Sequence, residues 1–222
     1  MILFEITGNE HNSPYQELAI ANVNRQFDFL KSIVLAAIAV DRGFLSHNTL
    51  KALNFHAIAC LHVSAGEYRP CPVKVGEYVP PEHYRVNALM DEFINYVNLR
   101  IGRMDPVVLA AFVLWKLNYI HPFINGNGRT ARAACYFILC LASGGWIEGE
   151  PILPQLLDRD HEDYVAALRS VDASLATGTL DLSQLHALIS KLLKEQIEGA
   201  NEPANTPPIV ATPDAPEQKP QL

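Results

Sequence analysis

The sequence predicts an all-α protein, a bundle of about seven or eight helices with one small β-hairpin. Most of the chain carries long apolar runs that begin at a capping residue and end near glycine. Only residues 68–80 change to the short period of a strand. The 222 residues, 49% hydrophobic and 18% charged, suffice for one domain with a sizeable core.

The first part of the chain predicts one long helix. Residues 1–12 show no helical pattern and are expected to form an irregular lead-in. Ser13 is a favourable N-cap and Pro14 suits the first helical position, so we expect the helix over Tyr15–Val40. Gly43 then interrupts the helical pattern.

Two further helices are expected on either side of the hairpin. Ser46 should cap a helix that continues to Leu61, and Gly66 ends that segment. After the hairpin, Pro81 should begin a helix that continues through Val97.

The hairpin itself is predicted from alternating valines among tyrosines and prolines in residues 68–80. Pro72 confines its strand to the edge of a sheet. An open edge strand can pair with the backbone of another chain, and a surface hairpin without a partner is the alternative.

The second half of the chain continues the helical pattern. Asp105 and Pro106 form an N-cap and first-position pair for a helix over Val107–Tyr119. A loop and a second helix follow, the helix running from about Asn127 to Ala142 and ending at two glycines. Two more helices are expected at 159–173 and 182–198, and a disordered, proline-rich tail from residue 201 onward.

Composition excludes several classes of function. A net charge of −7 argues against a nucleic-acid partner, because nucleic-acid-binding proteins carry a basic face. The N-terminus lacks the pattern of a signal peptide, and no apolar stretch reaches the roughly 18 residues of a membrane span. We therefore expect a cytoplasmic protein without a membrane partner.

The cysteines show no metal-binding spacing and are expected to be buried free thiols: Cys60, Cys71, Cys135 and Cys140.

The stretch from His121 to Arg132 predicts an anion-binding loop that opens a helix. Gly126 and Gly128 lack a Cβ, so the backbone there can adopt a positive φ and approach a phosphate closely. The amides and the dipole of the helix start favour an anion. Arg129 and Arg132 are three positions apart and can clamp phosphate oxygens from one face, while His121 can accept a proton. Each feature alone is compatible with a plain turn, but the combination favours the anion site.

This stretch resembles the signature of Fic-domain proteins, which reads His, any, Phe, any, acidic, Gly, Asn, Gly, Arg, any, any, Arg. Every fixed position matches except the acidic one, which holds Asn125. Residues 65–81 resemble the family's flap, and residues 110–120 resemble the helix before its loop. The similarity covers roughly residues 45–175.

The resemblance implies a Fic fold and transfer of AMP from ATP to a Ser, Thr or Tyr hydroxyl of a target protein. It also implies three parts of the chain: an N-terminal helical segment over 1–44 that packs on the core, the Fic domain over 45–199 and the tail over 200–222.

The resemblance implies a role for each residue of the loop. His121 would take the proton of the attacking hydroxyl. The backbone from Gly126 to Gly128 and the Asn127 side chain would donate to the phosphate, while Arg129 and Arg132 would hold the terminal phosphates. An apolar anchor and four flap residues that hold the target complete the set: Phe123, and Pro72, Val73, Lys74 and Val75.

Two positions depart from the family pattern. The acidic residue that Asn125 replaces helps to bind Mg²⁺ or Mn²⁺, and an amide oxygen is a legal ligand that brings no charge. Three outcomes stay open: a weaker metal site with activity kept, a different donor such as a UMP- or phosphocholine-bearing nucleotide, or a binding module without efficient catalysis. Tyr136 stands where the family often carries Asn, and it either stacks on the nucleobase or packs in the core.

Regulation is the last point on which the resemblance bears. Many Fic proteins restrain themselves with a glutamate that pairs with the second arginine of the signature, here Arg132. Glu17 and Glu198 match that pattern only in part, so we expect both to be ordinary solvated glutamates. Control by an antitoxin-like regulator or by homo-oligomers is the alternative.

Overall fold

The computed structural model describes residues 2–200, and its regular elements there are helices without a β-strand. They are α1 (Leu3–Thr7), α2 (Ser13–Ala39), α3 (His47–Ile58), the 3₁₀ turn η1 (His83–Arg85), α4 (Val86–Asn98), α5 (Pro106–Ile120), α6 (Asn127–Ser143), α7 (Leu153–Arg159), α8 (His161–Ala176) and α9 (Ser183–Gly199). The all-α prediction is confirmed for the described part of the chain.

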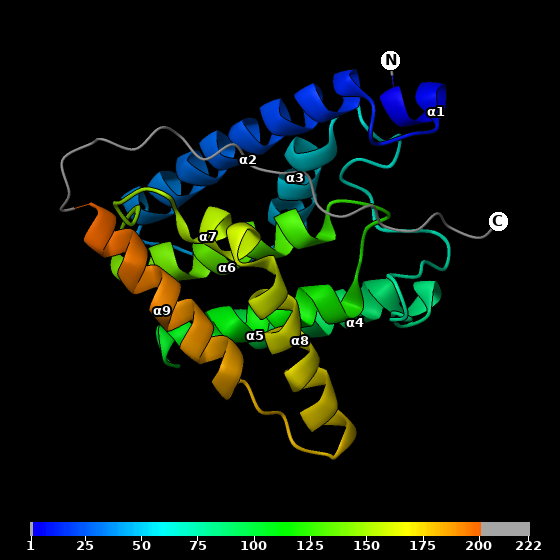
Figure 1. Ribbon diagram of the computed structural model, residues 1–222. Helices are drawn as coiled ribbons and strands as arrows, with labels where there is room; N and C mark the ends of the chain where they lie inside the picture. The colour runs from blue at the N-terminus through cyan, green and yellow to red at the C-terminus, as the bar shows by residue number, and fades with distance from the viewer. Residues whose placement is uncertain (1, 201–222) are drawn as a thin grey trace.

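Helix α6 occupies the centre of the bundle (Figure 1). It packs against α5 on one side and against α2, α3 and α7 on the others, while α9 packs on α5, α7 and α8. Thirteen residues of α6 are buried, so the helix has almost no solvent-facing stripe. The loop between α5 and α6 is therefore held between two core helices.

Local caps set the starts of α3 and α5 as expected, whereas the helix expected from Pro81 begins only at Val86, after the turn η1. The Ser46 side chain accepts from the Thr49 amide, and Asp105 accepts from the amides of Val107 and Val108. The prediction that Ser13 caps α2 is wrong, because Asn12 is the N-cap and its side chain accepts from the Tyr15 amide at 2.9 Å. Either residue suits the position by type, and the backbone conformation decides between them.

The sequence did not predict α1 and α7, and it extended α3 to Leu61, whereas α3 ends at Ile58. These short elements depend on distant partners. The first amides of α1 donate to the carbonyls of Cys60 and Leu61, and the Leu153 amide at the start of α7 donates to the side chain of Gln196. Helices this short are marginal alone, so their sequences carry little signal.

The hairpin expected over residues 68–80 is also wrong. Residue 75 pairs with residue 78 through two reciprocal backbone hydrogen bonds of 3.0 and 2.9 Å, and this single bridge does not extend into strands. Prolines at 70, 72, 80 and 81 supply no N–H group, so a ladder has few donors. A second isolated bridge joins Tyr68 to Phe123. We call residues 71–81 the flap; they form a loop held at both ends.

Cys135 and Cys140 are buried free thiols as expected, but Cys60 is exposed and Cys71 half-buried.

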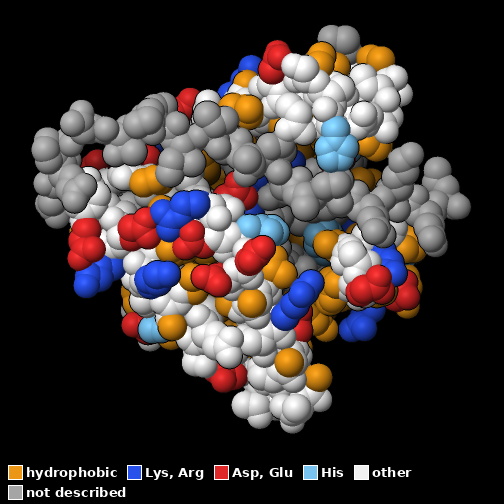
Figure 2. Space-filling model, in the orientation of Figure 1, with side chains coloured by type: hydrophobic (Ala, Val, Ile, Leu, Met, Phe, Trp, Pro, Cys, Tyr) orange, Lys and Arg blue, Asp and Glu red, His pale blue; other side chains and the backbone are white. Residues whose placement is uncertain are grey.

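The division of the chain at residues 44 and 199 stays a prediction, and residues 201–222, expected to be a disordered tail, lie outside the described residues. Within residues 2–200, no helix is both long enough and apolar enough to cross a lipid bilayer. On the face in Figure 2, acidic and basic side chains are interspersed, without a single basic patch.

Candidate functional site

A cavity of about 230 Å³ lies where the flap, the α5–α6 loop and α8 meet. His121 from the loop and Gly128 and Arg132 from α6 line one end. The other walls come from three elements: Val75 and Tyr78 of the flap, Trp115, Asn118 and Tyr119 of α5, and His161, Tyr164, Val165, Leu168, Arg169 and Asp172 of α8. The cavity thus joins a titratable base, a helix start and a guanidinium to an aromatic and aliphatic chamber.

His121 closes α5 and is 5% exposed. Its backbone adopts φ 51° and ψ 60°, a left-handed conformation that costs a β-carbon-bearing residue on the order of 1 kcal/mol. The surroundings hold it there: the His121 amide donates to the Leu117 carbonyl, and the His121 carbonyl accepts from Nε of Arg69 at 2.7 Å. This turn redirects the chain at the point where the imidazole reaches the cavity.

Arg69 is a functional candidate that the sequence analysis missed. It is 3% exposed, and its guanidinium donates to the carbonyls of Cys71 and Pro81 as well as to that of His121. Its own amide donates to the Pro122 carbonyl at 2.8 Å. Burial lowers the pKa of the Arg69 guanidinium, although a group with so high an ordinary value stays charged. No motif marked this residue, because its partners are backbone carbonyls, and those of His121 and Pro122 lie about fifty positions away along the chain.

The helix start expected at residues 126–128 is present. Gly126 is the N-cap of α6 with φ 74°, and no side chain caps the first turn. A Cβ on Gly126 would lie 2.8 Å from Cγ2 of Ile58, so both the conformation and the space require glycine. The expectation of a positive φ is wrong for Gly128, which lies inside the first turn of α6 and lines the cavity. The first-turn amides of a helix lack intrahelical acceptors, which makes this end suited to an anion.

The two arginines of the loop make different contacts in this structure. Arg132 lines the cavity, and its Nη2 lies 2.7 Å from Oδ1 of Asp158 in α7. Arg129 is absent from the cavity lining, and its guanidinium donates to the Ala57 carbonyl at 2.9 Å and to Oδ1 of Asn125 at 3.1 Å. Both arginines line a second, smaller pocket beside α2 and α7 together with Asp158, so they still share one side of α6.

Asp158 is a second residue that the sequence analysis missed. Arg132 and Asp158 are both largely buried, with side chains 6% and 13% exposed. The partial matches for an inhibitory glutamate behave as expected: Glu17 accepts from the Ser13 hydroxyl and Glu198 pairs with Lys194, both at the surface. The carboxylate that meets Arg132 instead comes from α7, a helix that the sequence did not predict.

Asn125 and the two side chains that it contacts do not fit a bound metal ion. The Asn125 oxygen accepts from Arg129, and the Asn125 nitrogen donates to Oε1 of Glu10 at 3.2 Å. A divalent cation on that oxygen would face a guanidinium. Among residues 2–200, no three His, Cys, Asp or Glu side chains gather as a metal site.

Three other site residues serve the fold. The Asn127 side chain accepts from the Phe123 amide and donates to the Phe123 carbonyl, both at 2.9 Å, so it holds the loop closed. Phe123 is fully buried against Tyr68, as expected of an anchor. Tyr136 is fully buried and bonded to the Ile147 carbonyl and Gln196, so of the two positions that the sequence left open it occupies the core one.

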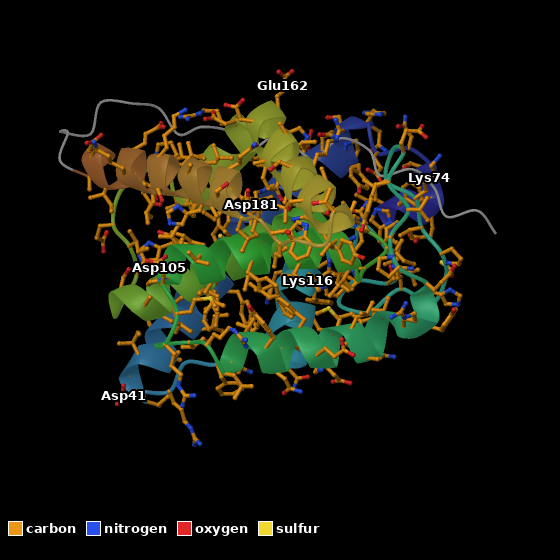
Figure 3. The ribbon with its side chains drawn as sticks, turned by 90° about the horizontal axis from the view of Figure 1, so that it is seen from below. Asp41, Lys74, Asp105, Lys116, Glu162 and Asp181 are labelled. Atoms are coloured by element: carbon orange, nitrogen blue, oxygen red, sulfur yellow. The ribbon has the colours of Figure 1, made fainter. Side chains whose placement is uncertain are left out.

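The flap residues divide between core, surface and cavity. Val73 is buried, and Lys74 points from the exposed edge of the molecule and pairs with Glu77 (Figure 3). Pro72 is exposed, and Val75 lines the cavity together with Tyr78, whose hydroxyl donates to the Tyr119 carbonyl at 2.6 Å. Of the four predicted flap residues, Val75 is the one that meets the cavity.

Comparison with known proteins gives a consistent picture. Residues 44–139 match the model of the Fic/DOC family. The protein adenylyltransferase Fic of Culex quinquefasciatus is 32% identical over 156 residues, which cover 62% of this chain and 30% of that protein. The protein of the same name from Drosophila ananassae is 44% identical over 71 residues, 32% of this chain and 14% of its own. The chain therefore spans less than a third of the length of these curated relatives.

Solved structures share the fold. A Fic domain-containing signaling protein from Bacteroides thetaiotaomicron superposes with a TM-score of 0.65 at 21% identity, covering 90% of this chain and 76% of that one. Fic-1 from C. elegans gives a TM-score of 0.62 at 24% identity, covering 80% and 48%. At such identities the likeness extends to the fold alone.

Proposed function

The chain belongs to the Fic/DOC family, and from this premise we propose that it transfers AMP from ATP to a hydroxyl side chain of a target protein. The observation that carries the proposal is the single cavity that His121, the start of α6 and Arg132 share. A base, a set of main-chain donors and a cation are the three groups that such a transfer requires.

The target oxygen attacks the α-phosphorus of ATP while His121 takes the hydroxyl proton. The bond between the α-phosphorus and the oxygen that bridges to the β-phosphate breaks, and pyrophosphate leaves. The first-turn amides of α6, including that of Gly128, donate to the α-phosphate oxygens, where negative charge builds up. Arg132 meets the departing phosphates once these displace Asp158.

The rest of the cavity suits the nucleoside. Tyr164, Val165 and Leu168 of α8 form an aromatic and aliphatic wall, with Val75 of the flap among the other lining residues. A flat, apolar base gains from such walls through stacking and burial. The target hydroxyl would then enter past the flap, whose Val75 and Tyr78 border the cavity. We assign no step to Mg²⁺ or Mn²⁺, since the Asn125 side chain already serves Arg129 and Glu10.

A second candidate is a weakened scaffold that binds a nucleotide or a protein without efficient transfer. The short ion pair between Arg132 and Asp158 favours this candidate, because it neutralises the cation that would hold the terminal phosphates. A transferase with a UMP or phosphocholine donor is the third.

Incubation with labelled ATP, UTP, GTP and CDP-choline separates these functions. The wild-type protein is compared with His121→Ala, and with His186→Ala as a matched control, since His186 lies outside the cavity near Asp105. Label from ATP that requires His121 but not His186 supports the proposal. Label from another donor supports the third candidate, and nucleotide binding without transfer supports the scaffold. The absence of both binding and transfer with every donor would contradict the proposal.

A further inference from the structure

Asn125 joins a carboxylate to a guanidinium through one amide group. Its Oδ1 accepts from Nη2 of Arg129 at 3.1 Å, and its Nδ2 donates to Oε1 of Glu10 at 3.2 Å. Asn125 is 6% exposed and the Glu10 side chain 16% exposed, so the chain of contacts is largely shielded from water. Residues 10, 125 and 129 thereby link the lead-in segment to the anion-binding loop.

The chemistry of the two neighbours fixes the residue between them. A guanidinium only donates hydrogen bonds, and an ionised carboxylate only accepts them. The bridging side chain must therefore accept at one end and donate at the other, which an amide does and a carboxylate does not. Aspartate at position 125 would place a second carboxylate against Glu10, and burial makes such like-charge contacts expensive.

Contacts with His62 and Gln16 hold Glu10 in place. Its carboxylate lies 3.4 Å from Nε2 of His62, and its backbone carbonyl accepts from the Gln16 side chain at 2.6 Å. Nε2 of His62 also lies 3.0 Å from the Tyr15 hydroxyl, and His62 is buried. The Gln16 bond thus holds the backbone at residue 10, and the carboxylate cannot move away from residue 125 without losing its contact with His62.

We infer that Asn125 is a connector that locks the N-terminal segment onto the loop, and that the positive charge beside this position is the Arg129 guanidinium and not a metal ion. Glu10 and Asn125 form a matched pair, so the acidic group of the loop region is carried by residue 10. Only the bearing of this inference on nucleotide binding rests on the proposed function; the pairing itself does not.

A double-mutant cycle on thermal stability tests the pairing. Asn125→Asp should lower Tm by about 5–10 °C at neutral pH, because two shielded carboxylates then face each other. Adding Glu10→Gln should restore at least half of that loss, since glutamine can donate to aspartate while aspartate accepts from Arg129. The controls are Asn24→Asp and Glu17→Gln, exposed positions that change charge equally, and each should leave Tm nearly unchanged.

Two outcomes of the cycle would overturn the inference: an Asn125→Asp variant as stable as the wild type, or additive effects of the two substitutions. The cycle involves no nucleotide, so a failure of the proposed function leaves it intact.

A metal titration tests the second part of the inference, that the positive charge beside Asn125 is a guanidinium and not a metal ion. Mn²⁺ alone, followed by electron paramagnetic resonance, should show no saturable binding to the wild type that Asn125→Ala removes. Saturable binding that depends on Asn125 would show that the side chain is a metal ligand, and the inference would be wrong.

Discussion

Nε of Arg69 donates a hydrogen bond of 2.7 Å to the backbone carbonyl of His121. The same guanidinium donates to the carbonyls of Cys71 and Pro81, which are the two ends of the flap. One buried side chain therefore fixes the flap relative to the imidazole. Because the flap and His121 border the same cavity, Arg69 is a positioning residue for the proposed transfer.

Arg69→Met should lower the transfer rate by about a hundredfold, since displacement of a reacting group by about 1 Å has an effect of that size. It should also lower the free energy of unfolding by about 3 kcal/mol, because several buried carbonyls lose a charged donor. Activity and urea unfolding are measured together. Arg69→Lys, which keeps the charge but not the fork of donors, should recover stability more than rate.

Arg100→Met serves as the control for loss of an arginine that bonds to a carbonyl, because Arg100 donates to Tyr96 outside the cavity. If Arg69→Met kept the wild-type rate while unfolding more easily, the residue would be structural only.

Asp158→Asn should increase the affinity for ATP by about tenfold, equivalent to ~1.4 kcal/mol, because a carboxylate then no longer neutralises the charge of Arg132. Calorimetric titration with a non-hydrolysable ATP analogue measures the change. Asp160→Asn is the matched control: Asp160 lies two residues away but pairs with Arg159. Equal affinities for the wild type and Asp158→Asn would mean that the ion pair does not compete with phosphate.

A comparison of Gly126→Ala with Gly8→Ala separates backbone strain from steric crowding. The added Cβ would meet Ile58 at 2.8 Å in a left-handed conformation, so we expect a loss of about 3 kcal/mol in the free energy of unfolding. Gly8 has φ +60° with open space around its Cβ position, so Gly8→Ala should cost about 1 kcal/mol, the strain alone. Equal losses in chemical denaturation would contradict the crowded packing of the loop against α3.

Three of the four thiols should react in two classes. Cys60 is exposed and should react quickly with a thiol reagent in the native protein. Burial raises the pKa of the Cys140 thiol to about 11, and burial also raises the pKa of Cys135. Since the thiolate is the reactive form, both should react at neutral pH only after unfolding. Rapid labelling of residue 135 or 140, read by peptide mass spectrometry, would contradict the buried packing of α6.

The sequence determined the features that depend on residues within one helical turn. Asp105 and Pro106 start α5, Gly126 ends the loop in a left-handed conformation, and Gly144 closes α6. Capping and glycine conformations arise from atoms three or four positions apart, so the local sequence carries them. The assignment of His121 to a cavity with the start of α6 follows from the same local geometry.

Tertiary structure decided which of these side chains remain available for chemistry. Arg129 and Asn127 carry the right groups at the right spacing, but one bonds to the carbonyl of Ala57 and the other to the backbone of Phe123. Arg69, Asp158 and Glu10 reach the loop from segments far along the chain or from helices too short to predict. The physical reason is that a polar side chain pairs with whatever donor or acceptor packing brings beside it, and burial makes that pairing obligatory.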